Sequence, residues 1–315
     1  MNRLSVCVTT YNRAPLLDRT LASLAAQTRH PDEVIVSDDC SSDETASVAE
    51  RWRPAFRQFI YRRNTTNLYM PGNLNACVAE ATGDYIANLH DADLFDKTLL
   101  QKWEAALDRY PSAGFVFCGV AMGDPAVSDD STPRASRLNR STILYRYQRR
   151  TVYLHDVEPL TRGREFFERH FLHATYSIVW GTVMARRDMY EQLLPFDRRF
   201  GWVSDVDMWM RACRDFDVAY VREPLMYLDQ SPTSERKFDW SRAEASRRLH
   251  AANIARFYGD SPERLAEKVT RHAWMFRWWY LRTVVALAAR RQFVMAAAGI
   301  RLLLRPLKRP AEDAP

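Results

Sequence analysis

The sequence predicts an α/β fold in which a mostly parallel, doubly wound sheet is flanked by helices and followed by a C-terminal helical appendage. Three observations lead to this prediction. Short β-rich apolar runs alternate with helical patterns through the N-terminal half, which is typical of strand–helix–strand units. Acidic and polar residues directly follow several of these runs, where parallel sheets gather ligands. Near the C-terminus the chain changes to basic stretches with Trp and Leu at helical spacing.

In the N-terminal half, each predicted strand is a run of β-branched, aromatic or small apolar residues. Each predicted helix places apolar residues three and four positions apart. Ser42 or Asp43 is expected to cap the second helix. The predicted strands are Leu4–Thr9, Glu33–Ser37, Phe59–Tyr61 and Asp84–Leu89, and the predicted helices are Leu16–Leu24, Thr45–Trp52 and Gly72–Ala81.

The elements after residue 110 are less regular. Phe115–Val120 predicts a further strand, and Ile178–Met184 a segment that returns to the sheet. Between them, Gly163–Phe171 has a helical pattern. Gly123–Asn139 is rich in Ser, Asp and Pro with little periodicity, which predicts a mobile surface loop.

Two carboxylates end the apolar run that begins at Tyr85. Asp91 and Asp93 are spaced one residue apart, so strand alternation would place them on the same side at the carboxyl edge of the sheet. Anionic groups held this close favour a divalent cation that bridges to a phosphate-bearing ligand. The alternative is a solvated turn, since Asp-x-Asp is common in turns. Tyr11, Asp38 and Asp39 also follow strand ends, which favours the metal.

These residues resemble a family 2 glycosyltransferase with the GT-A fold, in the family's order and spacing over about the first 120 residues. A later match lies at an acidic segment before a helix, and the similarity becomes weak after about residue 235. The motifs that carry the resemblance are Val6–Arg13, Leu24–Thr28, Glu33–Asp43, Asn73–Asn75, Ala81–Ile86, Asp91–Asp93 and Ser204–Arg211.

The resemblance implies a nucleotide-sugar donor bound by the N-terminal half. Tyr11 would stack on the base, and Asp39 would accept a hydrogen bond from the base's imide N–H, which favours uracil or thymine. Asp38 and Asp39 have the alternative of a helix-capping turn. The positions of donor-binding residues are occupied by Thr10, Tyr11, Asn12, Asp39, Asn75, Asp91 and Asp93.

The resemblance also implies a metal and a catalytic base. Asp93, with Asp91, would ligate Mn²⁺ or Mg²⁺ through the donor diphosphate, although Leu94 stands where the family often has a further Asp. Asp205 resembles the general base of an inverting transfer, and Ser204 stands where the family usually has Glu. Asp205 or Asp207 could instead cap the helix that follows, and Asp207 is also expected to brace the site.

The acceptor half is expected over residues 121–235, within a catalytic domain of residues 1–235 whose donor half is residues 1–120. His173, Tyr176 and Trp180 are candidates for stacking on an acceptor sugar, with the alternative that they are core residues. The expected acceptor is a glycan or a lipid-linked glycan, and the expected product an envelope or extracellular polysaccharide.

Residues 236–310 are predicted to form a basic, Trp-rich helical extension, followed by a tail at 311–315. Ten Lys or Arg residues and no Asp or Glu lie between Lys268 and Pro310, and without them the chain would be net acidic. Such helices can lie in the interface of an anionic membrane. Two alternatives stay open, because the same apolar faces could pack on the catalytic domain or on a second copy.

Composition excludes other classes. Scattered cysteines give neither a disulfide framework nor a zinc site, so we expect reduced thiols and a cytoplasmic enzyme, with peripheral contact at the inner face of the plasma membrane. The N-terminus leaves no room for a signal peptide, and no apolar run reaches the ~20 residues of a membrane span. We expect no nucleic-acid partner, because the basic charge belongs to the tail.

Two alternative functions remain beside a glycosyltransferase. A nucleotidyltransferase acting on a sugar phosphate would also use paired carboxylates, but it usually carries a Gly-rich loop near the start of the chain, and Thr9–Ala14 contains no Gly. A catalytically silent sugar-binding relative is opposed by the presence of Asp91, Asp93 and Asp205.

Overall fold

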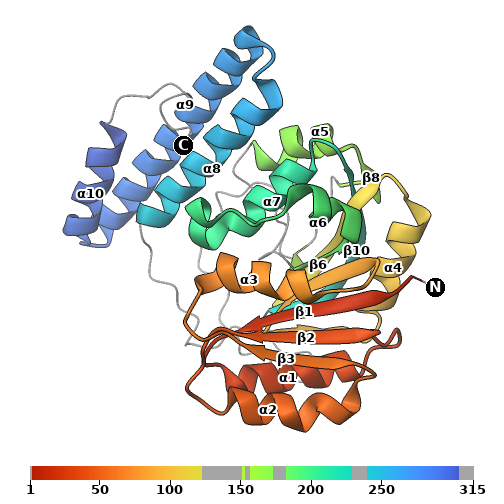
Figure 1. The fold of residues 1–315 in the computed structure, drawn as a ribbon. Coiled ribbons are helices and arrows are strands. Elements are labelled where there is room, and N and C mark those ends of the chain that lie inside the picture. The colour runs from red at the N-terminus through yellow and green to blue at the C-terminus, as the bar shows by residue number, and fades with distance from the viewer. Residues whose placement is uncertain (1, 123–150, 153–156, 173–181, 229–239, 305–315) are drawn as a thin grey trace.

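The computed structural model describes residues 2–122, 151–152, 157–172, 182–228 and 240–304 (Figure 1). Its centre is one mixed sheet with the strand order β3-β2-β1-β4-β9-β6-β10-β5, to which β7 and β8 add short pairings. The strands are β1 (Leu4–Thr10), β2 (Glu33–Asp38), β3 (Phe59–Arg63), β4 (Tyr85–His90), β5 (Asp93–Phe95), β6 (Ala113–Met122), β7 (Thr151–Val152), β8 (Leu160–Thr161), β9 (Val183–Arg186) and β10 (Asp217–Leu228).

The N-terminal half confirms the predicted strand–helix alternation. β1 pairs in parallel with β2 and β4, and β2 pairs in parallel with β3. Figure 1 shows α1 and α2 on one face of these strands and α3 on the other. The helices of this half are α1 (Ala14–Ala25), α2 (Thr45–Trp52), the 3-10 turn Arg53–Ala55, α3 (Tyr69–Glu80) and α4 (Leu99–Arg109).

The sheet separates two apolar cores, which explains why apolar residues follow one another directly along its central strands. Val6 and Val8 of β1 point to the core with α1 and α4, whereas Cys7 between them points to the core with α3. Side chains alternate along a strand, so a strand buried on both faces needs no polar position. All five cysteines are free, and Cys7 is among the buried ones.

The second half of the sheet is mixed. β9 lies between β4 and β6 and is antiparallel to both, while β6 and β10 are parallel and β10 is antiparallel to β5. The predicted strand at Phe115–Val120 is confirmed within β6. The strand predicted over Ile178–Met184 begins only at Val183, and residues 178–181 lie outside the described part, as does the loop predicted at Gly123–Asn139.

The helices of the second half surround this mixed region and continue into the C-terminal extension. Helical structure over Gly163–Phe171 is confirmed, as an α-turn followed by a π-turn. The helices are α5 (Gly163–Phe166), the π-turn Phe167–Phe171, α6 (Arg187–Leu193), the 3-10 segment Arg198–Val203, α7 (Ser204–Ala212), α8 (Trp240–Tyr258), α9 (Pro262–Ala289) and α10 (Phe293–Leu303).

The C-terminal extension has its own small core. Buried residues of α8, α9 and α10 pack together there, among them Trp240, Phe276 and Tyr280. The indole N–H of Trp240 donates to the carbonyl oxygen of Met295 at 2.7 Å, which ties α8 to α10. Among the described residues, none of the helices combines the length and the apolar character that crossing a membrane requires.

Candidate active site

The loops after β1 and β2 are tied together at the carboxyl edge of the sheet. Asn12 has a positive φ of 50°, a conformation that Asn tolerates better than most residues. Its backbone N–H donates to Ser41 Oγ, and its side-chain oxygen accepts from the Ser42 N–H, each at 2.8 Å. Asn12 therefore fixes the shape of both loops from within, so its predicted contact with the donor would be additional to this structural role.

Asp43 completes this arrangement by holding the starts of two helices. One carboxylate oxygen accepts from the Ala14 N–H at 2.9 Å and the other from the Thr45 N–H at 3.1 Å. Unpaired N–H groups at a helix start are stabilised by such acceptors. The N-cap position of α2 is Glu44, which makes no side-chain cap bond, so Asp43 meets the start of this helix from one position earlier than a cap residue.

Asp38 and Asp39 have different surroundings although they are adjacent. Asp38 closes the turn, because its carboxylate accepts from the Tyr61 hydroxyl at 2.6 Å and from the Ser41 N–H at 2.8 Å. Burial and the Asp38 carboxylate raise the pKa of the Tyr61 hydroxyl, so Tyr61 stays a donor. Asp38 therefore closes a loop turn, but it caps no helix, because α2 begins only at Thr45.

Asp39 is buried beside Thr10, whose carbonyl oxygen accepts from the Asp39 N–H at 2.9 Å. One Asp39 oxygen, Oδ1, accepts from Asn64 Nδ2 at 2.8 Å and from the Leu68 N–H at 2.7 Å. These bonds fix the carboxylate and occupy one of its oxygens. An Asp39 positioned in this way has a second oxygen with which to meet a base.

Asn73 supports Asp39 from α3, and it is a residue that the sequence analysis did not select. Its side-chain oxygen accepts from Ser37 Oγ at 2.6 Å and from Asn64 Nδ2 at 2.9 Å, so a buried chain of hydrogen bonds runs from Ser37 to Asp39. The motif Asn73–Asn75 contains both residues, and the donor contact predicted for Asn75 stays a prediction.

Asn75 is directed elsewhere. Its Nδ2 donates to the Phe196 carbonyl at 3.0 Å, and its Oδ1 accepts from the Phe196 N–H at 2.7 Å. Residues two apart on a helix face different directions, which is why Asn73 and Asn75 serve different parts of the fold. Asn75 joins α3 to the segment before α7, so a direct bond to the donor is not the role its contacts indicate.

Tyr11 and Thr10 differ sharply in exposure. The Tyr11 side chain is 46% exposed and lies at the end of β1, next to the loop that carries Asp39. Thr10 is buried. An exposed aromatic ring and a buried carboxylate at the ends of neighbouring strands could together stack on a base and bond its edge.

Asp91 and Asp93 lie at the same edge, but they flank a turn and do not share one strand. β4 ends at His90 and β5 begins at Asp93, with Asp91 in between. Both are buried, at 3% and 5% exposure. The backbone of Asp93 is held by Thr20 of α1, whose hydroxyl donates to the Asp93 carbonyl at 2.8 Å, and by pairing with Leu228 of β10.

Arg13 brings a positive charge to the Asp91 carboxylate. Its guanidinium lies 3.1 Å from Asp91 Oδ1 and its side chain is half exposed. Burial raises the pKa of the Asp91 carboxyl, and the Arg13 guanidinium opposes that rise. Arg13 was part of the recognised motif but was not predicted as a site residue.

The carboxylates at this edge are suitable ligands for a divalent cation that binds together with a diphosphate. Mg²⁺ and similar cations take oxygen ligands and often bind through one or two carboxylates together with substrate phosphates and water. Asp91 and Asp93 supply such carboxylates, and their burial makes a neutralising charge favourable. Over the described ranges, no group of three or more His, Cys, Asp and Glu side chains could hold a metal without other ligands.

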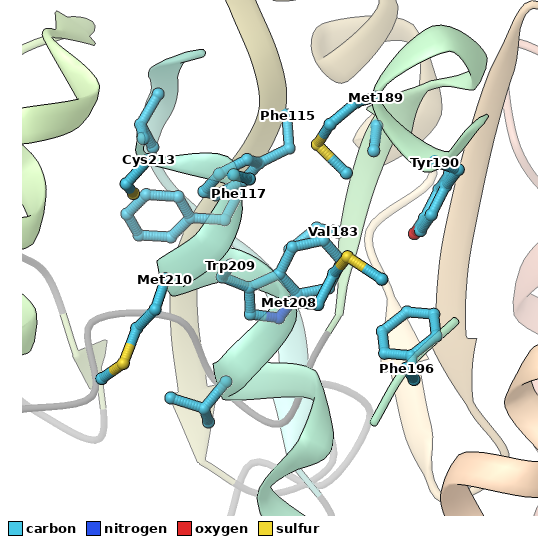
Figure 2. Packing of buried hydrophobic residues seen from close by; sticks show 14 of the residues in the cluster. Phe115, Phe117, Val183, Met189, Tyr190, Phe196, Met208, Trp209, Met210 and Cys213 are labelled. Atoms are coloured by element: carbon cyan, nitrogen blue, oxygen red, sulfur yellow. The ribbon is translucent and has the colours of Figure 1, made fainter. Parts of the chain in front are cut away.

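Asp205 lies in the first turn of α7, and its position depends on Trp209 one turn later. Residues four apart share a helix face, and Trp209 is fully buried with its ring centroid 5.3 Å from that of Phe115 and 6.1 Å from that of Phe196. Figure 2 shows this packing beneath α7. Asp205 is itself 5% exposed, and its Oδ1 accepts from the Val206 N–H at 2.8 Å.

Asp207 has the bracing role that the sequence predicted. It is fully buried and accepts from Arg211 Nε at 2.8 Å, Arg256 Nη1 at 2.7 Å and Asn253 Nδ2 at 2.9 Å. Arg256 and Asn253 belong to α8, so Asp207 fastens the helix that carries Asp205 to the C-terminal extension. The sequence analysis did not identify these α8 partners.

The two halves of the site meet at α3. Ser204 Oγ, at the start of α7, lies 3.6 Å from the Met70 sulfur in the first turn of α3. The same helix carries Asn73, which supports Asp39. One helix therefore sets the position of the donor edge relative to Asp205. The predicted acceptor residues His173, Tyr176 and Trp180 lie outside the described residues.

Curated relatives share this chain's sequence over different lengths. The putative glycosyltransferase EpsE of Bacillus subtilis is 26% identical over 247 residues, covering 76% of this chain and 78% of EpsE. The abequosyltransferase RfbV of Salmonella typhimurium is 34% identical over 157 residues, covering 48% of this chain and 46% of RfbV.

Solved structures share the fold. TarS 1–349 of S. aureus in complex with UDP-GlcNAc superimposes with a TM-score of 0.61 at 20% identity, over 93% of this chain and 79% of that one. The mannosyltransferase PcManGT of Pyrobaculum calidifontis in complex with GDP-Man and Mn²⁺ gives 0.56 at 17% identity, over 97% and 81%.

The model of the family described as glycosyl transferase family 2 matches residues 5–194, which include the strands and loops of the donor edge. This agrees with the strand order, the carboxylates at the sheet edge and the structural neighbours with nucleotide sugars. The chain therefore belongs to glycosyl transferase family 2 and is a glycosyltransferase with the GT-A fold.

Proposed function

We propose that this enzyme is an inverting, divalent-metal-dependent glycosyltransferase that moves a sugar from a UDP- or dTDP-sugar to an acceptor hydroxyl. The observation that carries the proposal is the arrangement of four buried carboxylates. Asp39, Asp91 and Asp93 lie at one edge of the sheet, and Asp205 begins the helix linked to that edge through α3.

The base preference rests on Tyr11 and Asp39. An exposed ring can stack on any base, whereas a carboxylate fixed by Asn64 and Leu68 is ready to accept from an imide N–H, which uracil and thymine present. Structural neighbours include complexes with UDP-GlcNAc and with GDP-Man, so the fold does not decide the base. Because Oδ1 of Asp39 is already occupied, its one remaining oxygen suits the single imide N–H of uracil or thymine better than the paired N1–H and amino donors of guanine.

Two carboxylates and one guanidinium would meet the diphosphate. Asp91 and Asp93 would hold Mn²⁺ or Mg²⁺, which supplies positive charge against the negative charge that develops on the departing diphosphate. Arg13, held at Asp91, would contact a phosphate oxygen directly. Two structural neighbours were crystallised with Mn²⁺, which agrees with this metal assignment.

Asp205 would act as the general base. Its carboxylate would take the proton from the acceptor hydroxyl as that oxygen attacks the anomeric carbon, and attack on the face opposite the diphosphate inverts the configuration. Trp209 fixes which face of α7 packs on the core, and Asp207 anchors the helix to α8. Both contacts hold the Asp205 carboxylate in place. The presence of Asp205 with Asp91 and Asp93 also argues against a silent sugar-binding relative, and family membership argues against a nucleotidyltransferase.

The relatives suggest the pathway class. One relative is named an abequosyltransferase and another a poly(ribitol-phosphate) β-N-acetylglucosaminyltransferase, and each matches about half of this chain. We infer an envelope or extracellular polysaccharide product, a glycan or lipid-linked glycan acceptor, and a cytoplasmic site of action.

The test uses donor hydrolysis, because it needs no acceptor. The enzyme is incubated with Mn²⁺ and α-linked UDP- or dTDP-sugars, and the released sugar is followed by proton NMR before mutarotation equilibrates the anomers. We expect the β anomer first, and a much slower release with Asp205→Asn. Release of the α anomer first, or hydrolysis that Asp205→Asn leaves unchanged, would contradict the proposal.

A further inference from the structure

The long helix α9 has two faces with opposite surroundings. One face carries His272, Phe276, Tyr280, Val284 and Leu287, which are buried against the rest of the C-terminal extension. The other carries a stripe of large apolar residues that nothing in the described structure covers. This outer stripe consists of Trp274, Trp278, Leu281 and Val285, which are 64%, 63%, 43% and 60% exposed.

The outer stripe is narrow and continuous. Its residues are spaced by four, three and four positions, so at about 100° per residue they lie within about 60° of one another around the helix axis. At a rise of about 1.5 Å per residue the stripe is about 17 Å long. The stripe does not continue toward the start of α9. Glu267, two turns before Trp274, lies on the same side of the helix and is charged.

Arginines border the outer stripe. By the same helical geometry Arg271 and Arg282 lie along one edge and Arg277 along the other. Arg271 and Arg282 are exposed. The following helix adds exposed apolar residues, with Phe293 at 65% and Val294 at 86%. No Asp or Glu occurs anywhere between Lys268 and Pro310.

The buried face answers one of the alternatives that the sequence left open. Packing within the chain uses the opposite side of α9, through the core that contains Trp240 and Phe276. The outer stripe is therefore not the surface that attaches α9 to the rest of the enzyme. In Figure 1, α9 and α10 lie at the side of the molecule farthest from α1 and α2.

A second copy of the chain is a poor occupant on grounds of charge. A two-fold dimer brings the same patch of both subunits together, which would place Arg271, Arg277 and Arg282 of one protomer near those of its partner. From Lys268 to Pro310 the sequence contains no Asp or Glu that could face the partner's Arg271 and Arg282 in such a dimer. An apolar stripe bordered by cations matches instead the boundary between lipid headgroups and acyl chains, where Trp is favoured and anionic headgroups pair with Arg.

We propose that the outer stripe of α9, together with the exposed residues at the start of α10, docks the enzyme on an anionic lipid surface. The helix lies in the plane of the interface, with Trp274 and Trp278 among the headgroups and the arginines at lipid phosphates. This inference does not depend on the donor or on the identity of the catalytic base. Docking would place the enzyme at the lipid surface, where the proposed lipid-linked acceptor would lie.

The experiment is vesicle co-sedimentation of the full chain. Vesicles of phosphatidylcholine alone are compared with an equal mixture of phosphatidylcholine and phosphatidylglycerol, at low and at high ionic strength. The apolar variant is Trp274→Ala with Trp278→Ala, and the charge variant is Arg271→Glu with Arg282→Glu. Matched controls are Tyr69→Ala, at an aromatic residue that is 74% exposed, and Arg57→Glu, at an arginine side chain that is 84% exposed.

The wild type and both controls are expected to bind the anionic vesicles at low ionic strength. Each double variant should bind about tenfold more weakly or worse, with unchanged thermal unfolding, because its residues are exposed. Three results would each overturn the proposal. These are a wild type that stays in the supernatant, double variants that bind as the wild type does, and a wild-type dimer in light scattering that Trp274→Ala with Trp278→Ala converts to a monomer.

Discussion

The Asp207 carboxylate of α7 accepts a hydrogen bond from the Arg256 guanidinium of α8 at 2.7 Å, and Asp207 is fully buried. This contact joins the helix of the proposed base to the C-terminal extension. Asp207 also binds Arg211 at 2.8 Å and Asn253 at 2.9 Å. A single buried carboxylate therefore pairs with two arginines and fixes the relation of two helices.

Removing that charge should destabilise the fold. Asp207→Asn leaves Arg211 and Arg256 without their anion, and we expect the free energy of unfolding to fall by about 3 kcal/mol. Urea unfolding measures this change. The control is Asp215→Asn, which breaks an exposed pair with Arg214 at 4.0 Å and should cost less than about 0.5 kcal/mol. Equal losses in the two variants would contradict the bracing role of Asp207.

Substitution of Asn64, which bonds Asp39, should weaken UDP binding, whereas substitution of Asn75, which bonds Phe196, should lower stability. Asn64→Ala removes the bond that positions Asp39, so we expect the Kd for UDP to rise about tenfold. Asn75→Ala removes two bonds to the Phe196 backbone, so it should lower the free energy of unfolding by about 2 kcal/mol and leave the Kd unchanged. Calorimetric titration and urea unfolding measure both quantities. If Asn75 bound the nucleotide-sugar donor, Asn75→Ala rather than Asn64→Ala would raise the Kd for UDP.

Stacking by Tyr11 can be tested without the metal site. Tyr11→Ala should raise the Kd for UDP by about tenfold or more, because stacking of a base on an aromatic ring is worth about 1–3 kcal/mol. Tyr11→Phe keeps the ring and should stay within about threefold of the wild type. Fluorescence or calorimetric titration measures both. An alanine variant with wild-type affinity would remove Tyr11 from the site.

Stability should fall in mild acid because of His272. Burial, together with the neighbouring His250 and Arg247, lowers the pKa of His272 to about 2. In the unfolded state this histidine has a pKa of about 6.5, so below that pH it binds a proton that the folded state does not bind. The free energy of unfolding therefore decreases as the pH falls below about 6.5. From pH 7.5 to 5.5 this histidine costs about 1.4 kcal/mol.

The control for that pH dependence is His272→Phe, which keeps an aromatic ring beside His250 and Phe276. Urea unfolding at the two pH values should show a smaller acid loss in this variant than in the wild type. An identical loss would mean that the acid sensitivity arises from other groups.

Much of the donor half could be predicted because local sequence decides it. Apolar strands and helical spacing place Tyr11, Asp39, Asp91 and Asp93 at strand ends, and the structure has them there. The choice between Asn73 and Asn75 could not be made, because it depends on which face of α3 meets the sheet. The hydrogen bonds of Asn73 and Asn75 become visible only when Asp39 and Phe196 are placed in space.

The acceptor half was harder to predict. β10 was missed because Arg222, Glu223 and Pro224 interrupt its apolar pattern, and the pairing of β10 with β6 is irregular between Val221 and Pro224. The partners of Asp207 lie on α8, far along the chain, where no local pattern marks them. Likewise, the spacing of Trp274 and Trp278 indicated a helix but not which of its faces is buried.

The most direct test of the proposed donor chemistry is a titration of UDP into wild type, Asp93→Asn and Asp205→Asn, each with and without Mn²⁺. The account predicts Mn²⁺-dependent binding by the wild type, loss of that dependence in Asp93→Asn, and wild-type binding by Asp205→Asn, because the base acts on the acceptor. Equal Mn²⁺-dependent affinity of the wild type and Asp93→Asn would contradict it.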